Sequence, residues 1–439
     1  MSILNVNKIN PVGGGSTITI AGIASVTNNI SVGNSVTAGS FVGPIEGNVT
    51  GNVTGNADTA SGLSGNASIN TTGIVTATSF VPTVGQLSHR NIIINGDFRI
   101  AQRGSSSTSN GYQTVDRWAH YTGSSGVTAT FSQQGTSSSD TPYQNGFSKF
   151  FRTALSGAGT ANAGAYFELM QTIEAQDIAN SGWNFKSSSS YITLSFWVRP
   201  STNQTFYGYL RSYDSAAYVY AFSFTASGNN TWTKITKTIA GNSNLQFDNN
   251  NGHGLLLMLT PFFGTDYTNN RTLNTWNAMD STNYFPDMAS TWLTAGASTF
   301  DVTGVQLEVG PVATPFEHRS AGDEFARCQR YYQQYVNISA VGYVPNNSSR
   351  TYSHGFFFPV EMRAAPTMSI TNTGSSNGQY ITDGDTNRYV SSVLSQGSKT
   401  THMSVSFNIS GDLSDYRGAY LFGTGNTSYQ TTYKLNAEL

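Results

Sequence analysis

The sequence predicts an all-β protein, and three observations support this fold class. Leu, Glu and Lys, which favour helices, are scarce, whereas Thr, Val, Tyr and Phe, which favour strands, are common. Short runs in which apolar and polar residues alternate recur along the chain, separated by turns rich in Gly, Asn and Ser. Charged residues make up 10% of the 439 residues, against about 25% in an average globular protein.

The low charge also excludes several classes of function. Lys and Arg total 22 and Asp and Glu total 24, so the net charge of −2 provides no electrostatic footprint for a nucleic-acid partner. No apolar run approaches the roughly 18–20 residues that a membrane helix needs, so we expect no membrane insertion. The single cysteine, Cys328, cannot form an intrachain disulfide.

Residues 1–87 form the first predicted element. They contain two aromatic and three charged residues, and they repeat: the sequence of residues 36–42 recurs nearly unchanged at 75–81, and Gly-Asn-Val-Thr occurs twice in between. Burial yields about 25 cal/mol per Å², whereas ordering costs about 1–2 kcal/mol per residue, so one such chain cannot fold alone. Either the segment is a flexible linker, or several identical chains share one thin core. The β-branched residues and the repeat favour the second, an intertwined β stalk.

Residues 88–319 are expected to form a central jelly-roll β-sandwich. All six tryptophans lie here. Apolar residues alternate over 192–198, recur at Phe222 and Phe224, and flank Gly304, as in short strands of a sandwich. One helical stretch is expected over 168–179.

Residues 320–336 are predicted to form one short linking helix. Ser320 followed by Asp323 is a variant of a capping box. Four apolar residues then follow at helical spacing and predict a single stripe that contacts neighbouring copies of the chain: Phe325, Cys328, Tyr332 and Tyr335.

Residues 337–439 are predicted to form a C-terminal β-sandwich, because apolar residues alternate over 356–362 and 403–409. Asp383–Asn387 begins like a calcium loop but lacks the glycine and the carboxylate that such a loop needs further on, so we expect a hairpin turn. The histidines show no paired ligand spacing and no nucleotide-binding motif occurs. We therefore expect no metal and no cofactor.

Several motifs resemble those of bacteriophage tail proteins. The segment 91–104 followed by Asp116-Arg117-Trp118 resembles the opening of a domain common in these proteins, and 305–317 resembles its closing strand. Residues 192–198 are similar to a strand of carbohydrate-binding-module jelly rolls. The Gly-Asn-Val-Thr repeats resemble the shafts of tail fibres from phages of cyanobacteria. Within this set we expect Arg117 and Glu308 to form a buried ion pair.

The resemblance implies a virion protein of the tail fibre or the baseplate periphery. It implies a homotrimer whose N-terminus joins other tail or baseplate proteins and whose distal domains bind host cell-surface polysaccharide without enzymatic activity. Residues 1–11 show no secretory signal, so we expect the protein either to stay in the cytoplasm of the cell that makes it or to leave by another route, such as on a virion released by lysis. Two alternatives remain: a baseplate or collar component without receptor contact, and a tail-associated polysaccharide depolymerase. The sparse carboxylates disfavour the depolymerase.

The segment 264–292 is the candidate glycan-binding region, because it is long, rich in Asn and aromatic, and binding residues often lie on loops of β scaffolds. Aromatic rings pack against sugar faces, and Asp and Arg bind sugar hydroxyls. The alternative is that the aromatic residues fill the core or a subunit seam. The candidate residues are Asp266, Tyr267, Arg271, Trp276, Tyr284 and Trp292.

Overall fold

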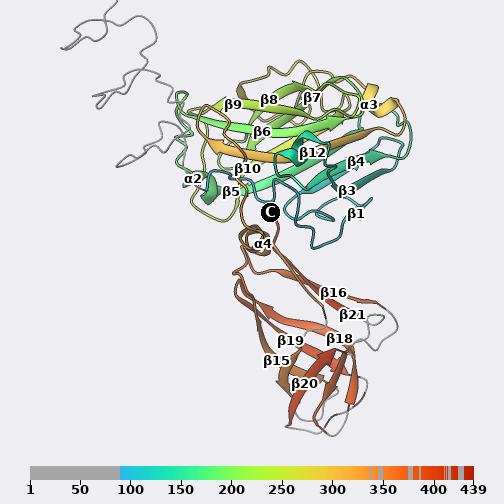
Figure 1. Cartoon of the computed structure of the whole chain (residues 1–439). Coiled ribbons are helices and arrows are strands. Elements are labelled where there is room, and N and C mark those ends of the chain that lie inside the picture. Colours follow the sequence, from blue (N-terminus) through green and yellow to red (C-terminus); the bar gives the residue numbers. More distant parts are fainter. Residues whose placement is uncertain are drawn as a thin grey trace, which may run out of the picture. The chain divides into compact units, whose positions relative to one another are not determined.

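The computed structural model describes residues 89–336, 339–344, 350–373, 379–384, 387–409, 411, 413, 417–423 and 430–439. The predicted β stalk over residues 1–87 lies outside the described residues. The described part is mostly β and consists of several antiparallel sheets, which confirms the all-β class (Figure 1).

Two six-stranded antiparallel sheets form the jelly-roll sandwich. The first sheet consists, in spatial order, of β1 (Ser106–Ser107), β3 (Ala129–Gly135), β4 (Lys149–Leu155), β12 (Thr299–Val309), β6 (Tyr191–Pro200) and β9 (Thr233–Ala240). The second sheet consists, in spatial order, of β11 (Trp276–Ala278), β8 (Tyr218–Thr225), β7 (Thr205–Ser212), β10 (His253–Phe263), β5 (Tyr166–Glu174) and β2 (Ala119–Gly123). The layers lie face to face (Figure 1).

The core of the sandwich follows from the alternation in the strands. Ile192, Leu194, Phe196 and Val198 of β6 all point inward and are fully buried. They join one apolar cluster with residues of the second sheet, such as Phe222 of β8. The period-2 pattern read from the sequence therefore identifies the buried face correctly.

The helix expected over 168–179 is wrong in its first part. Residues up to Glu174 belong to β5, and only Ala175–Ala179 are helical, as α2. The strand is favoured because β5 pairs with β10 on one side and β2 on the other, which gives its backbone a complete set of partners. Two further short helices are α1 (Thr141–Gln144) and α3 (Thr291–Thr294).

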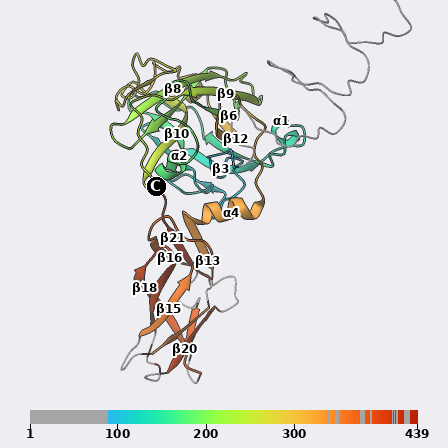
Figure 2. The same cartoon turned by 90° about the vertical axis from the view of Figure 1, so that its left-hand side faces the viewer.

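The linking helix is shorter than predicted. It is α4 (Ala321–Gln329), and the Ser320 Oγ accepts a hydrogen bond from the Asp323 backbone N–H at 3.1 Å, which confirms the predicted cap. The chain then continues as strand β13 (Tyr332–Val336), which pairs with β21 (Gln430–Asn436), as Figure 2 shows. The aromatic run after Gln329 favours a strand, and β21 offers it hydrogen-bond partners.

This change of element breaks the predicted contact stripe. Phe325 is 38% exposed, but Cys328 is fully buried and Tyr332 is 3% exposed within the chain. Tyr332 and Tyr335 lie on a strand, where helical spacing no longer places them on one face with Phe325. Cys328 packs instead against Ile94 and Tyr331.

The C-terminal strands close into a barrel in place of the predicted two-sheet sandwich. The barrel consists, in order, of β14 (Ala340–Tyr343), β15 (Arg350–Phe357), β19 (His402–Ile409), β18 (Asn387–Ser398), β17 (Gln379–Thr382) and β20 (Gly418–Gly423). A separate three-stranded sheet contains β13, β21 and β16 (Thr367–Thr373). The barrel closes because β14 pairs with both β15 and β20. Strands β17 and β18 pair antiparallel on either side of the turn predicted at Asp383–Asn387, whose residues 385 and 386 lie outside the described residues.

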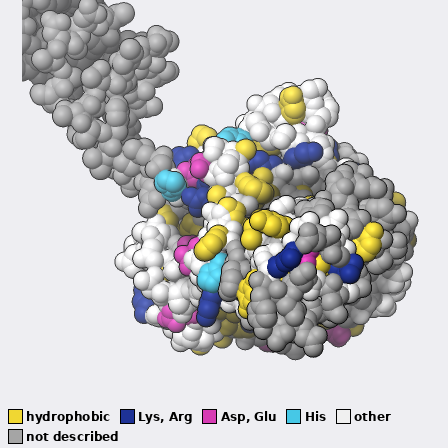
Figure 3. Space-filling model, turned by 90° about the horizontal axis from the view of Figure 1, so that it is seen from below, with side chains coloured by type: hydrophobic (Ala, Val, Ile, Leu, Met, Phe, Trp, Pro, Cys, Tyr) yellow, Lys and Arg dark blue, Asp and Glu magenta, His cyan; other side chains and the backbone are white. Residues whose placement is uncertain are grey.

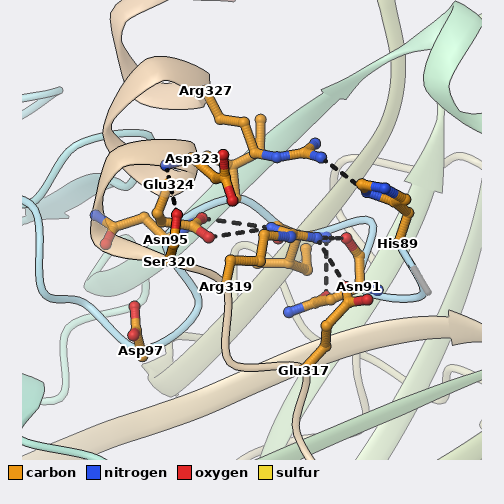
Figure 4. A network of polar contacts seen from close by, with 12 residues as sticks. His89, Asn91, Asn95, Asp97, Glu317, Arg319, Ser320, Asp323, Glu324 and Arg327 are labelled. Atoms are coloured by element: carbon orange, nitrogen blue, oxygen red, sulfur yellow. Dashed lines mark hydrogen bonds and ion pairs between the residues drawn. The ribbon is translucent and has the colours of Figure 1, made fainter.

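A polar network joins the first described residues to the segment after β12 (Figure 4). The Arg319 guanidinium lies between the Glu324 carboxylate, at 3.3 Å, and the backbone carbonyls of Asn91 and Ile93. The Glu317 carboxylate accepts the Asn91 backbone N–H at 3.0 Å. The motif that opens with Asn91 therefore has a structural role: it ties the two ends of the jelly roll together.

The predicted ion pair between Arg117 and Glu308 is wrong. Arg117 pairs with Glu438 and donates to the Thr172 carbonyl, whereas Glu308 accepts the Thr314 backbone N–H at 2.8 Å. Both side chains are buried as expected, but each has its partner in another part of the chain.

Candidate functional site

The segment 264–290 packs on the outer face of the second sheet. The Tyr284 ring stacks on Tyr209 of β7, with ring centroids 5.2 Å apart and planes at 12°. The Phe285 ring lies 5.3 Å from Tyr207 of the same strand. This packing covers the outer face of the sheet over β7.

A cleft of about 310 Å³ lies over β5 and β2, at one edge of the second sheet. Four tyrosines, two further apolar side chains, one serine and one carboxyl group line it: Tyr121, Tyr166, Tyr267, Tyr284, Phe263, Met170, Ser281 and Glu168. A mainly aromatic cavity with a few polar groups is the usual composition of a ligand site.

The floor of the cleft consists of side chains on the outer face of the neighbouring strands β5 and β2. Tyr166, Glu168 and Met170 alternate along β5, so all three point to the outer face while Phe167 points into the core. Tyr121 of β2 is the direct cross-strand neighbour of Glu168. The walls come from Phe263 at the end of β10 and from the segment 264–290, which we call the covering segment. In this segment the Tyr267 ring meets the Tyr166 ring edge-on, with ring centroids 5.8 Å apart.

The Glu168 carboxyl group is the only charged side chain that lines the cleft. Nothing in the described part of the chain donates a hydrogen bond to its oxygens or forms an ion pair with them. Burial raises the pKa of Glu168 to about 7, because desolvation disfavours the charged form. The side chain thus has two acceptor oxygens without protein partners.

The four tyrosine hydroxyls are likewise available to a ligand. Those of Tyr121, Tyr166, Tyr267 and Tyr284 form no hydrogen bond within the described residues. A tyrosine offers an apolar ring face together with a hydroxyl that both donates and accepts. This combination suits a sugar, which presents C–H patches beside hydroxyl groups.

The structure divides the six predicted binding residues. Tyr267 and Tyr284 line the cleft, whereas Asp266 is exposed outside its lining. The other three are buried. Trp292 is fully buried in the sandwich core, Trp276 donates to the Ala240 carbonyl at 2.9 Å, and Arg271 donates to the Ala278 carbonyl at 3.1 Å. Trp276 and Trp292 thus belong to the apolar core, which is the alternative expected for the aromatic residues, and Arg271 is held by a backbone carbonyl.

Sequence reasoning missed the floor of the cleft. The alternation Tyr-Phe-Glu-Leu-Met over 166–170 is a strand signal that places Glu168 beside two apolar neighbours on one face. We missed this strand signal because we expected a helix over 168–179. The contribution of Tyr121 depends on the register between β2 and β5, for which the local sequence holds no signal.

Two other hollows in the described residues border the polar network of Figure 4, and the larger, of about 710 Å³, is lined by Glu317, Arg319 and Arg327 of that network. A polar hollow of about 350 Å³ beside His89 and Arg327 borders the network of Figure 4, and its Asn91 side is occupied by hydrogen bonds of that network. Hydrophobic side chains also reach the surface on the face shown in Figure 3. On the barrel, Val341, Phe357 and Tyr420 are exposed, but they line none of the hollows described above. The cleft at Glu168 is therefore the candidate site.

No described helix has the length and apolar character to cross a bilayer. No group of three His, Cys, Asp or Glu side chains within the described ranges is placed to hold a metal ion.

The Glu168→Gln variant will be more stable than the wild type at pH 8, by about 1–2 kcal/mol after allowing for solvent screening. Because the folded pKa of about 7 lies above the ordinary value, the native state binds more protons than the unfolded state between about pH 4.5 and 7. Wild-type stability is therefore lost as the pH rises through this window, and glutamine carries no such penalty. Thermal unfolding at pH 5 and pH 8 measures the difference, which should shrink toward zero at pH 5. An equal difference at both values would contradict the desolvated position of Glu168.

No family model matches the chain, and no curated protein matches it. Among solved structures it is similar to a carbohydrate-binding module of family 4, at 12% identity and a TM-score of 0.26, over 49% of this chain and 97% of that one. It is similar to family 16 carbohydrate-binding module 2 at 14% identity and a TM-score of 0.18, over 42% of this chain and 86% of that one.

The enzymatically active domain of bacteriophage CBA120 tailspike protein 4 is a third similar structure, at 11% identity and a TM-score of 0.26. The match covers 50% of this chain and 21% of the tailspike chain, so this chain spans about a fifth of that protein's length. At these TM-scores the likenesses carry no weight for function, and we base the function on the cleft itself.

Proposed function

We propose that the protein is a non-enzymatic adhesin of a phage tail fibre that binds a host surface glycan in the cleft at Glu168. One observation carries the proposal: four tyrosines with unused hydroxyls surround an unpaired carboxyl group on the outer face of a jelly-roll sheet. Such a site offers ring faces for sugar C–H patches and polar atoms for hydroxyls.

Binding suits this cleft better than hydrolysis does. Glycoside hydrolysis uses two carboxyl groups that flank the scissile bond at about 5–10 Å from each other. The residues that line the cleft include one carboxyl group. Glu168 therefore serves as a hydrogen-bond partner of the glycan, and release of reducing sugar from host polysaccharide would instead identify a depolymerase.

The cleft alone gives weak binding, because it is small and partly open. A fibre in which identical chains share a stalk over residues 1–87 presents several clefts at once, and the effective concentration then strengthens attachment. We propose a homotrimer, joined through its N-terminal region to other tail or baseplate proteins and carried on the virion. The molecular mass of the full chain in solution tests this assembly: a trimer is expected, and a monomer would contradict it.

Replacing Tyr121 or Tyr267 with alanine will weaken glycan binding about tenfold, or about 1.4 kcal/mol each. Each change removes one ring from the cleft and leaves the sandwich core intact, because both side chains lie on the outer face. Calorimetric titration with oligosaccharides of the host surface measures the effect.

The matched control is Tyr143→Ala. Tyr143 is a tyrosine of helix α1 that is 48% exposed and does not line the cleft. Affinity should stay within twofold of the wild type. If the control variant loses binding while both cleft variants retain it, the glycan binds elsewhere. Unchanged host adsorption by phage carrying the cleft variants would favour a structural tail component without receptor contact.

A further inference from the structure

We propose that the cleft selects glycans carrying a positively charged ammonium group, as an unacetylated amino sugar does. This inference rests on the proposed glycan-binding function and names the class of sugar. The geometry points to it through two features of one cavity: aromatic rings on several sides and a carboxylate on the floor whose charge the protein leaves uncompensated.

The charge around Glu168 is the first feature. The other titratable groups that line the cleft are neutral phenols: Tyr121 from β2, Tyr166 from β5, and Tyr267 and Tyr284 from the covering segment. Two more phenols outside the lining interact electrostatically with Glu168: Tyr209 of β7 and Tyr213 just after it. Arg211 lies on β7, which β10 separates from β5; its guanidinium is stacked over the Tyr213 ring at 4.5 Å and does not line the cleft. An anion in such surroundings is stabilised by a ligand that brings its own positive charge.

The aromatic walls are the second feature. Tyr166, Tyr267 and Phe263 meet one another edge-on or tilted, at centroid distances of 5.4–6.4 Å, so their rings face the cavity from different directions. Ring faces carry partial negative charge and attract cations, and cages of this kind recognise ammonium groups. A neutral sugar uses the same ring faces but gains nothing from the carboxylate.

The test compares charged ligands with neutral ligands of similar size. A glucosamine tetramer, its N-acetylated counterpart and a glucose tetramer are titrated into the full chain at pH 7.5. Choline and its neutral isostere 3,3-dimethylbutan-1-ol are titrated in parallel, which separates an ammonium substituent from the sugar ring itself. The wild type should bind the glucosamine tetramer at least tenfold more tightly than either neutral tetramer, and choline more tightly than the isostere.

The Glu168→Gln variant provides the matched control. It keeps the shape of the cleft and removes the charge, so the preference for the glucosamine tetramer over the two neutral tetramers should fall at least tenfold. For choline, whose charge is fixed, wild-type affinity should rise between pH 5.5 and pH 8 as the Glu168 carboxyl group ionises, and the variant should show no such rise.

The outcomes separate this inference from the proposed function. Equal affinity for charged and neutral tetramers, unchanged in Glu168→Gln but lost in Tyr267→Ala, would overturn the ammonium inference and leave glycan binding in the cleft intact. Binding of host glycan that neither cleft variant alters would overturn both. The comparison of choline with its isostere needs only the wild-type chain, so it holds even if a variant were to fold poorly.

Discussion

Replacing Glu438 with glutamine will destabilise the jelly-roll domain by about 3–5 kcal/mol. The Glu438 carboxylate is 4% exposed and pairs with two arginines of the jelly roll, with Arg103 at 3.1 Å and with Arg117. The Arg117 side chain is 1% exposed. Glutamine would leave Arg117 as a buried charge without a counter-ion. Removing only one partner of a buried ion pair is strongly destabilising, because the remaining charge is uncompensated.

The surroundings of Glu438 cannot easily compensate for this loss. The Arg117 guanidinium lies over the Tyr331 ring at 3.4 Å, and that of Arg103 lies over Tyr332 at 3.7 Å. Both cations are therefore enclosed by aromatic rings that hold them in place. Asp116, the remaining carboxylate nearby, is 3.9 Å from Arg103 and already accepts the Gln102 backbone N–H.

Thermal and denaturant unfolding of the full chain measures this effect, with Glu361→Gln as the matched control. Glu361 is an exposed glutamate whose carboxylate accepts the Thr400 hydroxyl at 2.8 Å. Its replacement should change stability by no more than about 0.5 kcal/mol. A Glu438→Gln variant as stable as this control would show that solvent reaches the Arg117 site.

Replacing Gly96 with alanine will cost about 3 kcal/mol, the second large effect. A β-carbon at this position would overlap the carbonyl oxygen of Val305 in β12 and would lie 3.3 Å from the Ile93 side chain. The Gly96 carbonyl accepts the Val305 backbone N–H at 2.9 Å, so the two backbones are held in contact. Because the obstacle is backbone and not a flexible side chain, strand β12 must move to admit the methyl group.

Gly322→Ala is the matched control for this substitution. Gly322 lies in α4, and a β-carbon there meets nothing within 4 Å. Alanine should therefore stabilise the helix by about 0.5–1 kcal/mol, since glycine loses more backbone entropy on folding. Differential scanning calorimetry of both variants should give melting temperatures that shift in opposite directions. A Gly96→Ala variant that melts with the wild type would mean that the segment 91–98 is not closely docked on β12.

Two predictions from the sequence show that a local pattern can be sufficient to locate a strand or the start of a helix. The alternation in residues 192–198 predicted a strand with one buried face, and those apolar residues are the core-facing residues of β6. The pairing of Ser320 with Asp323 predicted a helix start, and the cap is present at that position. Both depend on residues within one turn or one strand of each other, so short-range physics decides them.

The wrong interpretations share a different cause. Tyr332 and Tyr335 fit a helical stripe by spacing, yet a strand more than 90 residues away in the sequence, β21, binds their backbone and makes them part of a sheet. Arg117 has its counter-ion 321 residues later, at Glu438. Such partners come from topology, and no local periodicity identifies them.

The amino-acid sequence by itself determined that this protein is built of strands, where many of them lie, and that the segment 264–292 is rich in aromatic residues. Only the tertiary structure decided which of those aromatic residues fill the core and which face a cleft, because that depends on how the segment lies across the second sheet. It also brought Tyr121 beside Glu168, since the register of β2 against β5 is set by pairing between strands distant in the chain. The pKa of Glu168 is raised, and its carboxyl group is placed to bind a ligand, because the fold buries it among residues from other strands and loops. Its own position in the sequence does not determine either property.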